Sequence, residues 1–481
     1  MIVQELLLVL PEIVISIMAC LILILGAFLK KKDNYIIYYI CLFTNMSIIY
    51  IINILLEYNI DDKIFDGSIS IDNFTLMLKM IIIIFASIII ICSQKYISGI
   101  SLYKGEYFTL VMFAILGMMV LISSWNFLTL YLGLELLSLS LCVLISLSRK
   151  YFHAQEAAIK YFIMSSVSSG LLLFGISLIY GITNTIDFSK IGLILNNTEL
   201  QNNMILKIGL IFIISGIIFK FGAVPFHMWV PDVYHGAPVP ITILISTLPK
   251  IAIVGIFYKL FIQVFHNMSH VWCYLIMLVS IASIFFGNFI AISQSNIKRM
   301  LAYSAIANIG FILSGTLVSI EHGYIPVLFY TIIYILNSFG MFLVIMLFSY
   351  NGLESENIND FKGLWQKKPF LSFIICVLLF SLIGIPPTAG FYAKFLILRS
   401  LVESGHVAFV IFALIMSVIG GFYYLNIIRV IFFEKQISNI NVSINYGLSN
   451  TGFYILIVNG LCILCFGIVP TPILKICMLI L

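Results

Sequence analysis

Four ionisable residues stand inside long apolar stretches, and their types could support proton transfer: Glu135, Lys220, Lys250 and Lys394. A charged side chain at the centre of a bilayer costs about 2.5 to 3.5 kcal/mol on insertion scales, so each is a functional candidate by default. Burial favours the neutral form of a lysine, whereas a nearby carboxylate favours its charged form. A movable Glu135 beside Lys220 would therefore switch the protonation of that lysine and pass protons between helices. The alternative for all four is a structural role as buried charges.

A glycine and a proline interrupt the apolar stretch directly after Lys220, at Gly222 and Pro225. Proline has no N–H group, so Pro225 leaves the carbonyl of Phe221 without its helical donor. An unpaired backbone group at membrane depth is tolerated only where protein or a water-filled cavity satisfies it. The sequence therefore predicts a helix break that brings water and dipoles to Lys220.

Further prolines stand beside the other two lysines. Pro249 directly precedes Lys250, and Pro386 and Pro387 precede Lys394 by about two helical turns. The same argument predicts helix breaks at these prolines. The carbonyls that they would free belong to Ile245, Leu382 and Ile383.

Other ionisable residues near the apolar stretches have simpler interpretations. Lys79 lies about two turns into its stretch, from which its flexible stem would reach the membrane interface. Glu12 and Lys259 are interpreted as boundary or packing residues. Lys160 begins a stretch and is either an interface anchor or a donor of protons toward Lys220.

Two histidines, His227 and His235, lie around the segment that follows Pro225. Histidine ordinarily titrates near pH 6.5, so either could relay protons; a loop histidine bonded to backbone is the alternative. No carboxylate or cysteine stands at a helical offset from them, which argues against a metal site. The chain has no P-loop, no GxGxxG after a strand and no second CxxC beside Cys462 and Cys465. We therefore expect no nucleotide, flavin or iron–sulfur site in it.

The composition places these residues in a membrane. Of 481 residues, 62% are hydrophobic and 9% charged, with a mean hydropathy of +1.15, whereas soluble domains are about half apolar and a quarter charged. This predicts an all-α polytopic membrane protein, a single domain over 1–481, with about fourteen transmembrane helices. The predicted spans lie near 3–29, 35–56, 74–94, 107–123, 126–147, 157–181, 205–226, 240–265, 270–292, 299–319, 323–349, 371–399, 405–433 and 452–478.

Two spans, the seventh and the twelfth, are broken in a similar way, in IIFKFGAVPFHMW and SLIGIPPTAGFYAKF. An offset of five spans reverses the orientation in the membrane. Spans four to eight (107–265) and nine to thirteen (270–433) are therefore predicted to be inverted five-helix repeats with discontinuous helices 7 and 12. Helices 1 to 3 lie within 1–100, and helix 14 is 452–478.

Basic residues mark the cytoplasmic side of a membrane protein, and here they gather in the connections after odd-numbered spans. This bias predicts that both termini lie on the outer face. The basic residues are Lys30, Lys31, Lys32, Lys95, Lys104, Arg149, Lys150, Lys298, Arg299, Lys362, Lys367, Lys368 and Lys435.

Several long strings resemble a known family, namely GLELLSLSL, IIFKFGAVPFHMWVPDVYHGAPVPIT, STLPK, SQSNIKRMLAYSAIANIGF and LIGIPPTAGFYAKF. They are similar to strings in the antiporter-like membrane subunits of bacterial NADH-quinone oxidoreductase, respiratory complex I, and the resemblance runs almost end to end. Within that family the N subunits look most similar. The start LLLVLPEIV resembles theirs, no long lateral helix follows the fourteenth span, and Lys394 stands where a sibling subunit carries glutamate.

The resemblance implies two inverted five-helix bundles and roles for the matching residues in a proton path. Glu135 is the carboxylate on the fifth span and Lys220 its partner. Lys250 is the central relay, and Lys394 is the residue toward the exit. We call these four residues the relay.

Two positions depart from the family pattern. Asn308 stands where relatives often have histidine, so a titrating group on the tenth span is in doubt. His235 stands where related loops have an acidic residue.

The resemblance also implies that the protein moves protons outward across the bacterial inner membrane, as a multi-pass subunit of an NADH:quinone oxidoreductase. NADH, FMN, iron–sulfur clusters and quinone are expected in partner subunits, with no cofactor or metal in this chain. Expected partners are other membrane subunits, including the sibling antiporter-like subunits, and the lipid bilayer, with no nucleic acid. Two alternatives stay open: a subunit of a multisubunit sodium/proton antiporter, and a non-pumping structural membrane subunit.

Overall fold

The computed structural model describes residues 2–29, 35–58, 60–100, 105–148, 152–319, 323–349, 354, 356–435 and 449–481. Thirteen helices in these ranges are long and apolar enough to cross a membrane. The predicted twelfth span is instead two 15-residue helices, α18 (Pro369–Ile383) and α19 (Ala389–Glu403). The predicted all-α polytopic fold is therefore confirmed. Some basic residues used in the orientation argument lie outside the described residues, namely Lys30, Lys31, Lys32, Lys104, Arg149 and Lys150.

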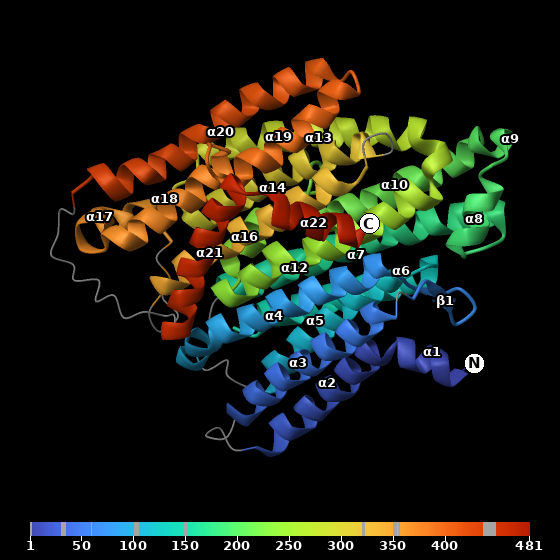
Figure 1. Ribbon diagram of the computed structural model, residues 1–481, viewed down its shortest axis with the longest axis horizontal. Coiled ribbons are helices and arrows are strands. Elements are labelled where there is room, and N and C mark those ends of the chain that lie inside the picture. Colours follow the sequence, from blue (N-terminus) through green and yellow to red (C-terminus); the bar gives the residue numbers. More distant parts are fainter. Residues whose placement is uncertain are drawn as a thin grey trace.

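The N-terminal part forms a short helix, three long helices and a hairpin. Its elements are α1 (Ile2–Leu8), α2 (Leu10–Phe28), α3 (Tyr35–Glu57), β1 (Asp62–Ile64), β2 (Ile69–Ile71) and α4 (Asn73–Gly99). The predicted first span is divided at Val9, because Pro11 in the first turn of α2 favours a helix start there. Figure 1 shows α2 and α3 at one edge of the molecule, far from α20.

The first predicted repeat contains five long helical units, the fourth of them in two pieces. They are α5 (Gly105–Ser123), α6 (Phe127–Ser146), α7 (Phe152–Thr183), α10 (Met204–Phe221) with α11 (Trp229–Gly236), and α12 (Val239–Phe257). A π-helical segment, η2 (Tyr258–Val264), extends α12. The short helices α8 (Phe188–Ile194) and α9 (Thr198–Gln201) connect α7 to α10.

The second predicted repeat has the same order of helices. It contains α13 (Ser269–Ile292), α14 (Ile297–Leu317), α16 (Ile325–Leu347), α18 with α19, and α20 (Val407–Phe433). Short helices η3 (His266–Met268), η4 (Ile358–Phe361) and α17 (Leu364–Lys367) lie in its connections. The predicted fourteenth span is two helices, α21 (Asn450–Ile468) and α22 (Thr471–Ile480), with Pro470 between them.

Each repeat has its break at the end of the first piece of its fourth unit. Gly222 ends α10 with φ 78° and Gly384 ends α18 with φ 89°, a left-handed conformation that glycine adopts without steric cost. The Gly222 N–H bonds to the carbonyl of Ile218 at 3.0 Å, and the Gly384 N–H to that of Phe380 at 2.9 Å. This equivalence supports the boundaries 107–265 and 270–433, which we propose for the repeats.

Helix α12 is buried along its whole length and packs against α4, α5, α10 and α16, so it touches the N-terminal part and both predicted repeats. The prediction of a helix break at Pro249 is wrong, because α12 continues through that residue. A proline removes one helical hydrogen bond. Neighbouring helices and hydroxyl side chains keep the rest of the helix in its helical conformation. Near Pro249, the hydroxyls of Ser246 and Thr247 bond to the carbonyl of Ile243 at 3.1 and 2.6 Å.

Candidate functional site

Lys220 lies in the last turn of α10, one residue before the helix ends. Its side chain is buried, and its Nζ donates a hydrogen bond to Ser165 Oγ of α7 at 2.8 Å. Gly222 has a reason to be glycine beyond its positive φ, since a Cβ there would lie 2.5 Å from Val230 Cγ2. The break therefore places the lysine at a tight junction between α7, α10 and α11.

Lys250 reaches the same break from α12. Its Nζ donates to the carbonyl of Phe221 at 2.5 Å and to that of Lys220 at 3.3 Å. The side chain is buried, and Nζ lies 5.7 Å from the centroid of the Trp229 ring. The sequence predicted that Pro225 frees the Phe221 carbonyl, and here this carbonyl is satisfied by an ammonium group.

Lys394 does the same at the second break. Its Nζ donates to the carbonyls of Leu382 at 3.2 Å and Ile383 at 2.8 Å, the two that the prolines were predicted to free. The Phe311 ring centroid lies 5.0 Å from Nζ. A small cavity beside Lys394, also lined by Asn308, has room for about one water molecule.

Glu135 lies on α6, and its Oε1 is buried without a hydrogen-bond partner among the described residues. No ion pair within 4 Å joins it to Lys220 in the described part of the chain, where Lys220 bonds to Ser165 instead. Glu135 is nevertheless close enough to act on Lys220 electrostatically. The partnership of Glu135 with Lys220 stays a prediction. The contact of Lys220 with Ser165 was missed, since one serine among several in IMSSVSSG gives no distinguishing signal.

Lys160 lies on the surface in a network of ion pairs. Its side chain is 43% exposed, and its Nζ lies 2.7 Å from Glu156 and 2.8 Å from Asp232 on α11. Arg299 also pairs with Asp232, at 2.9 Å. Burial raises the pKa of Asp232, but hydrogen bonds from Lys160 and Arg299 outweigh it and hold the pKa below its ordinary value. The network fastens α11 to α7 and α14.

The two histidines lie in different surroundings. His227 is buried in the segment between α10 and α11, and its Nδ1 has no hydrogen-bond partner in the described ranges. His235, at the end of α11, has its Nε2 3.0 Å from Glu356 Oε2. A relay role for His227 remains a prediction.

Asn308 belongs to a hydrogen-bonded network between the helices of the second repeat. Its Oδ1 accepts from the hydroxyl of Tyr330 on α16 at 2.8 Å, and its Nδ2 donates to the carbonyl of Ser304 at 2.8 Å. The Ser304 hydroxyl bonds to that of Tyr424 on α20. These partners were not predictable from the sequence, because single hydroxyl side chains in apolar helices show no periodic pattern.

A buried ion pair joins two N-terminal helices. Lys79 Nζ of α4 lies 2.5 Å from Glu12 Oε1 of α2, with side-chain exposures of 0% and 7%. The interpretation of Lys79 as a lysine that reaches the interface is wrong, because Glu12 and the Ser123 hydroxyl, 3.2 Å from Oε1, give this polar pair its partners inside the protein. Lys259 is buried as well and donates to Ser70 Oγ and the Ile122 carbonyl, both at 2.6 Å.

Within the described residues, no group of three or more histidine, cysteine, aspartate or glutamate side chains could hold a metal ion.

Comparison with known proteins gives a consistent result. Residues 124–420 match the family model described as NADH:quinone oxidoreductase/Mrp antiporter, TM. The NADH-quinone oxidoreductase subunit N of Methylovorus glucosotrophus is 38% identical over 97% of this chain and 96% of that protein. The subunit N of Thioalkalivibrio sulfidiphilus is 40% identical over 96% of this chain and 95% of its own length.

Two solved structures share the fold. One is a chain of respiratory complex I from Thermus thermophilus with bound aureothin, with a TM-score of 0.79, 23% identity and coverage of 97% of this chain and 98% of that one. The other belongs to the Mrp complex from Dietzia, with a TM-score of 0.82, 17% identity and coverage of 100% and 97%. At this identity they indicate the fold alone. Taken with the relatives of 38 and 40% identity, they place the chain in the family of NADH-quinone oxidoreductase N subunits.

Proposed function

We propose that the protein is a proton-translocating membrane subunit of an NADH-quinone oxidoreductase. Protons move outward through Glu135, Lys220, Lys250 and Lys394, while other subunits oxidise NADH and reduce quinone. NADH, FMN, iron–sulfur clusters and quinone then belong to the partner subunits, and this chain carries no redox cofactor of its own. The chain lies in a bacterial inner membrane beside other membrane subunits, including its siblings, with both termini on the outer side.

The observation that carries this proposal is the placement of two lysines at helix breaks. Lys250 and Lys394 donate to backbone carbonyls at the ends of α10 and α18, and neither has a carboxylate within ion-pair distance in the described residues. Carbonyl dipoles stabilise an ammonium group but do not hold it permanently in its charged form. A buried carboxylate partner would hold it in that form. Such a lysine can gain and lose a proton when a neighbouring charge changes.

Glu135 is the group that would change this balance at Lys220. Two unit charges 4 Å apart attract by about 4 kcal/mol at an effective dielectric constant of 20, and by about half as much at 8 Å. The difference is more than a tenfold change in protonation equilibrium. A modest movement of α6 or of the Glu135 side chain therefore suffices to load or unload Lys220.

Proton movement against the membrane potential needs an external source of energy. Each charge costs about 2.3 kcal/mol per 100 mV. The relay contains no chemistry that releases energy, so in this proposal the redox subunits drive it through a conformational or electrostatic change. A sodium/proton antiporter subunit is the second candidate, because the Mrp chain from Dietzia has the same fold.

The decisive experiment replaces Lys220 or Glu135 by Ala and measures protons moved per NADH oxidised, in membrane vesicles that hold the assembled complex. Translocation should fall, whereas Lys207→Ala, at the other end of α10, should leave it unchanged. A non-pumping structural subunit predicts the wild-type ratio in all three variants. An antiporter subunit predicts a proton movement that depends on sodium and not on NADH.

A further inference from the structure

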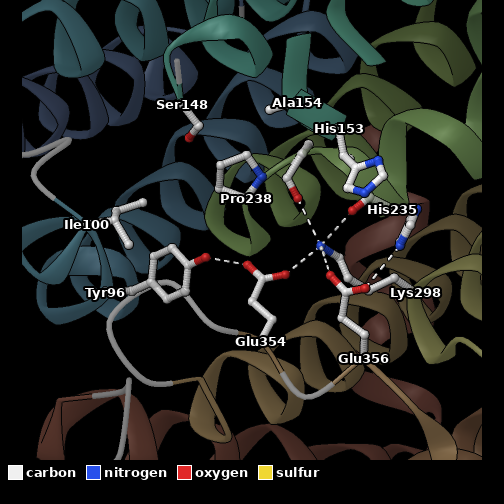
Figure 2. Close-up of a pocket in the computed structure, with 12 residues that line it drawn as sticks. Tyr96, Ile100, Ser148, His153, Ala154, His235, Pro238, Lys298, Glu354 and Glu356 are labelled. Carbon is white, nitrogen blue, oxygen red and sulfur yellow. Dashed lines mark hydrogen bonds and ion pairs between the residues drawn. The ribbon is translucent and has the colours of Figure 1, made fainter. Parts of the chain in front are cut away.

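A cavity of about 280 Å³ opens at one end of the bundle, where α4 and α6 end and α7, α12 and α14 begin (Figure 2). This volume holds several water molecules at about 30 Å³ each. Its lining comes from segments that follow odd-numbered spans, which the distribution of basic residues assigns to the cytoplasmic face. The polar residues of the lining include Tyr96, His153, His235, Lys298, Glu354 and Glu356.

Lys298 joins the two repeats at this cavity. Its Nζ donates to the carbonyls of His235 at 2.9 Å and Ala237 at 3.0 Å, and to Glu354 Oε2 at 2.5 Å. The Lys298 side chain is only 2% exposed, so salt screens these contacts little. They hold the corner between α11 and α12 against α14 and Glu354.

The pair of His235 and Glu356 lies at the more open side, with side-chain exposures of 25% and 35%. Glu356 Oε2, 3.0 Å from His235 Nε2, also accepts from Asn296 Nδ2 at 3.0 Å. Burial raises the pKa of Glu356, but the hydrogen bond from His235 and the charge of Lys298 outweigh it and lower the pKa below its ordinary value. Glu356 therefore stays ionised at neutral pH and can only accept a hydrogen bond, so the N–H between the two side chains belongs to His235.

Other titratable groups face His235 from the elements around it. The His153 ring of α7 lies 5.7 Å from the His235 ring. Lys298 comes from α14, and Glu354 and Glu356 come from the segment after α16. Asp232, on the same helix as His235, forms its ion pairs with Lys160 and Arg299.

Two buried tyrosines, Tyr234 and Tyr161, lie on helices that border the cavity. Tyr234, next to His235 in α11, is fully buried, and its hydroxyl has no hydrogen-bond partner among the described residues. Buried polar groups normally have a hydrogen-bond partner, from the protein or from ordered water. The Tyr161 ring of α7 packs against the same helix α11, with its centroid 5.1 Å from that of Trp229. Helix α7 in turn packs against α6, which carries Glu135, so α7 lies between the helix of Tyr234 and the first residue of the relay.

We propose that this cavity, lined by His153, His235, Lys298, Glu354 and Glu356, is the uptake vestibule of the relay, where His235 takes a proton from water on the cytoplasmic face. The inference rests on the proposed proton-pumping function. Nε2 of a neutral His235 carries the N–H that bonds to Glu356, so the other ring nitrogen, Nδ1, accepts the proton, and Glu356 balances the charge of the imidazolium. His235 then releases this proton to water. The Tyr234 hydroxyl takes up one proton as it gives another onward, and both side chains return to their starting state.

The test is His235→Asn in the assembled complex, with proton translocation per NADH measured in vesicles over a range of pH. We expect a loss of about threefold or more near pH 8, where protons are scarce, and little change near pH 6, where water supplies them without a collecting group. Added imidazole should restore the rate at the higher pH, because it carries protons into the vestibule. Glu434→Gln is the control, since it changes a charged pair at the predicted cytoplasmic face outside the cavity: Glu434 is paired with Lys362 and its side chain is 30% exposed.

Two results would overturn the vestibule. One is a wild-type rate for His235→Asn at every pH. The other is a loss that is equal at every pH and not reversed by imidazole, which indicates a structural role. If His235→Asn does not assemble, Tyr234→Phe decides, because it removes a single hydroxyl, and unchanged translocation in that variant contradicts the proposed path. Lys220→Ala separates failure of the pump from failure of the vestibule. Full translocation in that variant contradicts the proposed pump. A loss that imidazole does not restore supports the pump, and the result for His235→Asn then decides the vestibule.

Discussion

Lys250 Nζ lies 2.5 Å from the carbonyl oxygen of Phe221, the last residue of α10, although the two residues belong to different helices and lie 29 positions apart in the chain. The contact joins the fully buried helix α12 to the break in the first repeat. Lys394 makes the corresponding contact in the second repeat from within its own broken unit, since α19 follows α18 directly. At both breaks a lysine ammonium group binds the backbone carbonyls at the helix end. The breaks differ in which helix supplies the lysine.

Replacing Lys250 by Met or by Arg separates its structural role from its role in proton transfer. Lys250→Met leaves the carbonyls of Phe221 and Lys220 without their donor, which should cost about 1 to 3 kcal/mol of stability and lower proton translocation. Lys250→Arg keeps a donor but holds its proton permanently. We expect this variant to assemble and to lose translocation, as measured by protons moved per NADH. Wild-type pumping by the arginine variant would contradict the transfer role. Lys190→Met, an exposed lysine of α8, is the control.

Gly222→Ala tests the left-handed end of α10. The substitution puts a side chain at φ 78° and a Cβ 2.5 Å from Val230, so it should destabilise the protein by about 1 to 2 kcal/mol or more. Gly181→Ala in α7 is the matched control, because a Cβ there meets nothing within 4 Å, and alanine in a helix gains about 0.5 to 1 kcal/mol over glycine. Thermal unfolding in detergent should rank Gly181→Ala at or above the wild type and Gly222→Ala below it. Equal midpoints for the two variants would count against the described geometry.

A double-mutant cycle tests the buried pair of Glu12 and Lys79. Either Glu12→Gln or Lys79→Met alone leaves one charge buried without its partner, which should cost about 3 to 5 kcal/mol. The double variant removes both charges and should recover most of that loss. The midpoint of thermal unfolding is the measurement. Losses that simply add in the double variant would show that the two residues do not stabilise each other.

Asp232 provides a prediction about pH. Its pKa is lower in the folded protein than the ordinary value near 3.9, so the unfolded chain binds a proton more readily than the folded one. The stability that the carboxylate contributes is therefore fully present above about pH 4 and is lost as the pH falls through the lower, folded pKa. Asp232→Asn should unfold at a lower temperature than the wild type at pH 7. This gap in unfolding temperature between variant and wild type should close below about pH 4. A gap that stays constant down to about pH 2 would assign the effect to packing and not to the charge.

Much of the architecture follows from composition and from breaks in apolar stretches. Long apolar runs predict spans because a bilayer requires about 20 residues, and both broken units were located from their prolines and glycines. The prediction failed at Pro249, where the same residue type stands in a helix enclosed on every side. The loss of one helical hydrogen bond at a proline is a local effect. Whether the helix continues through the proline depends on neighbouring helices, which a single sequence does not reveal.

The site was predictable as a set of residues and not as a set of contacts. Charges in apolar surroundings identified Lys250 and Lys394, and the prolines identified the carbonyls of Phe221, Leu382 and Ile383 that they bind. Which lysine reaches which carbonyl depends on packing between helices far apart in the chain. Glu354 and Glu356 were missed for another reason: they stand in a connection, where no periodic pattern distinguishes a structural carboxylate from a solvated one.

The pairing of Glu12 with Lys79 has a consequence for how the chain is synthesised. When α2 first enters the lipid, α4 has not yet been translated, and the carboxylate of Glu12, in the first turn of α2, stands without its partner at a cost in free energy. That cost is recovered when the third long helix arrives with its ammonium group. The first three long helices should therefore leave the translocation machinery together, as one cooperative insertion unit, and truncation of the nascent chain before Lys79 should leave the first helix poorly anchored.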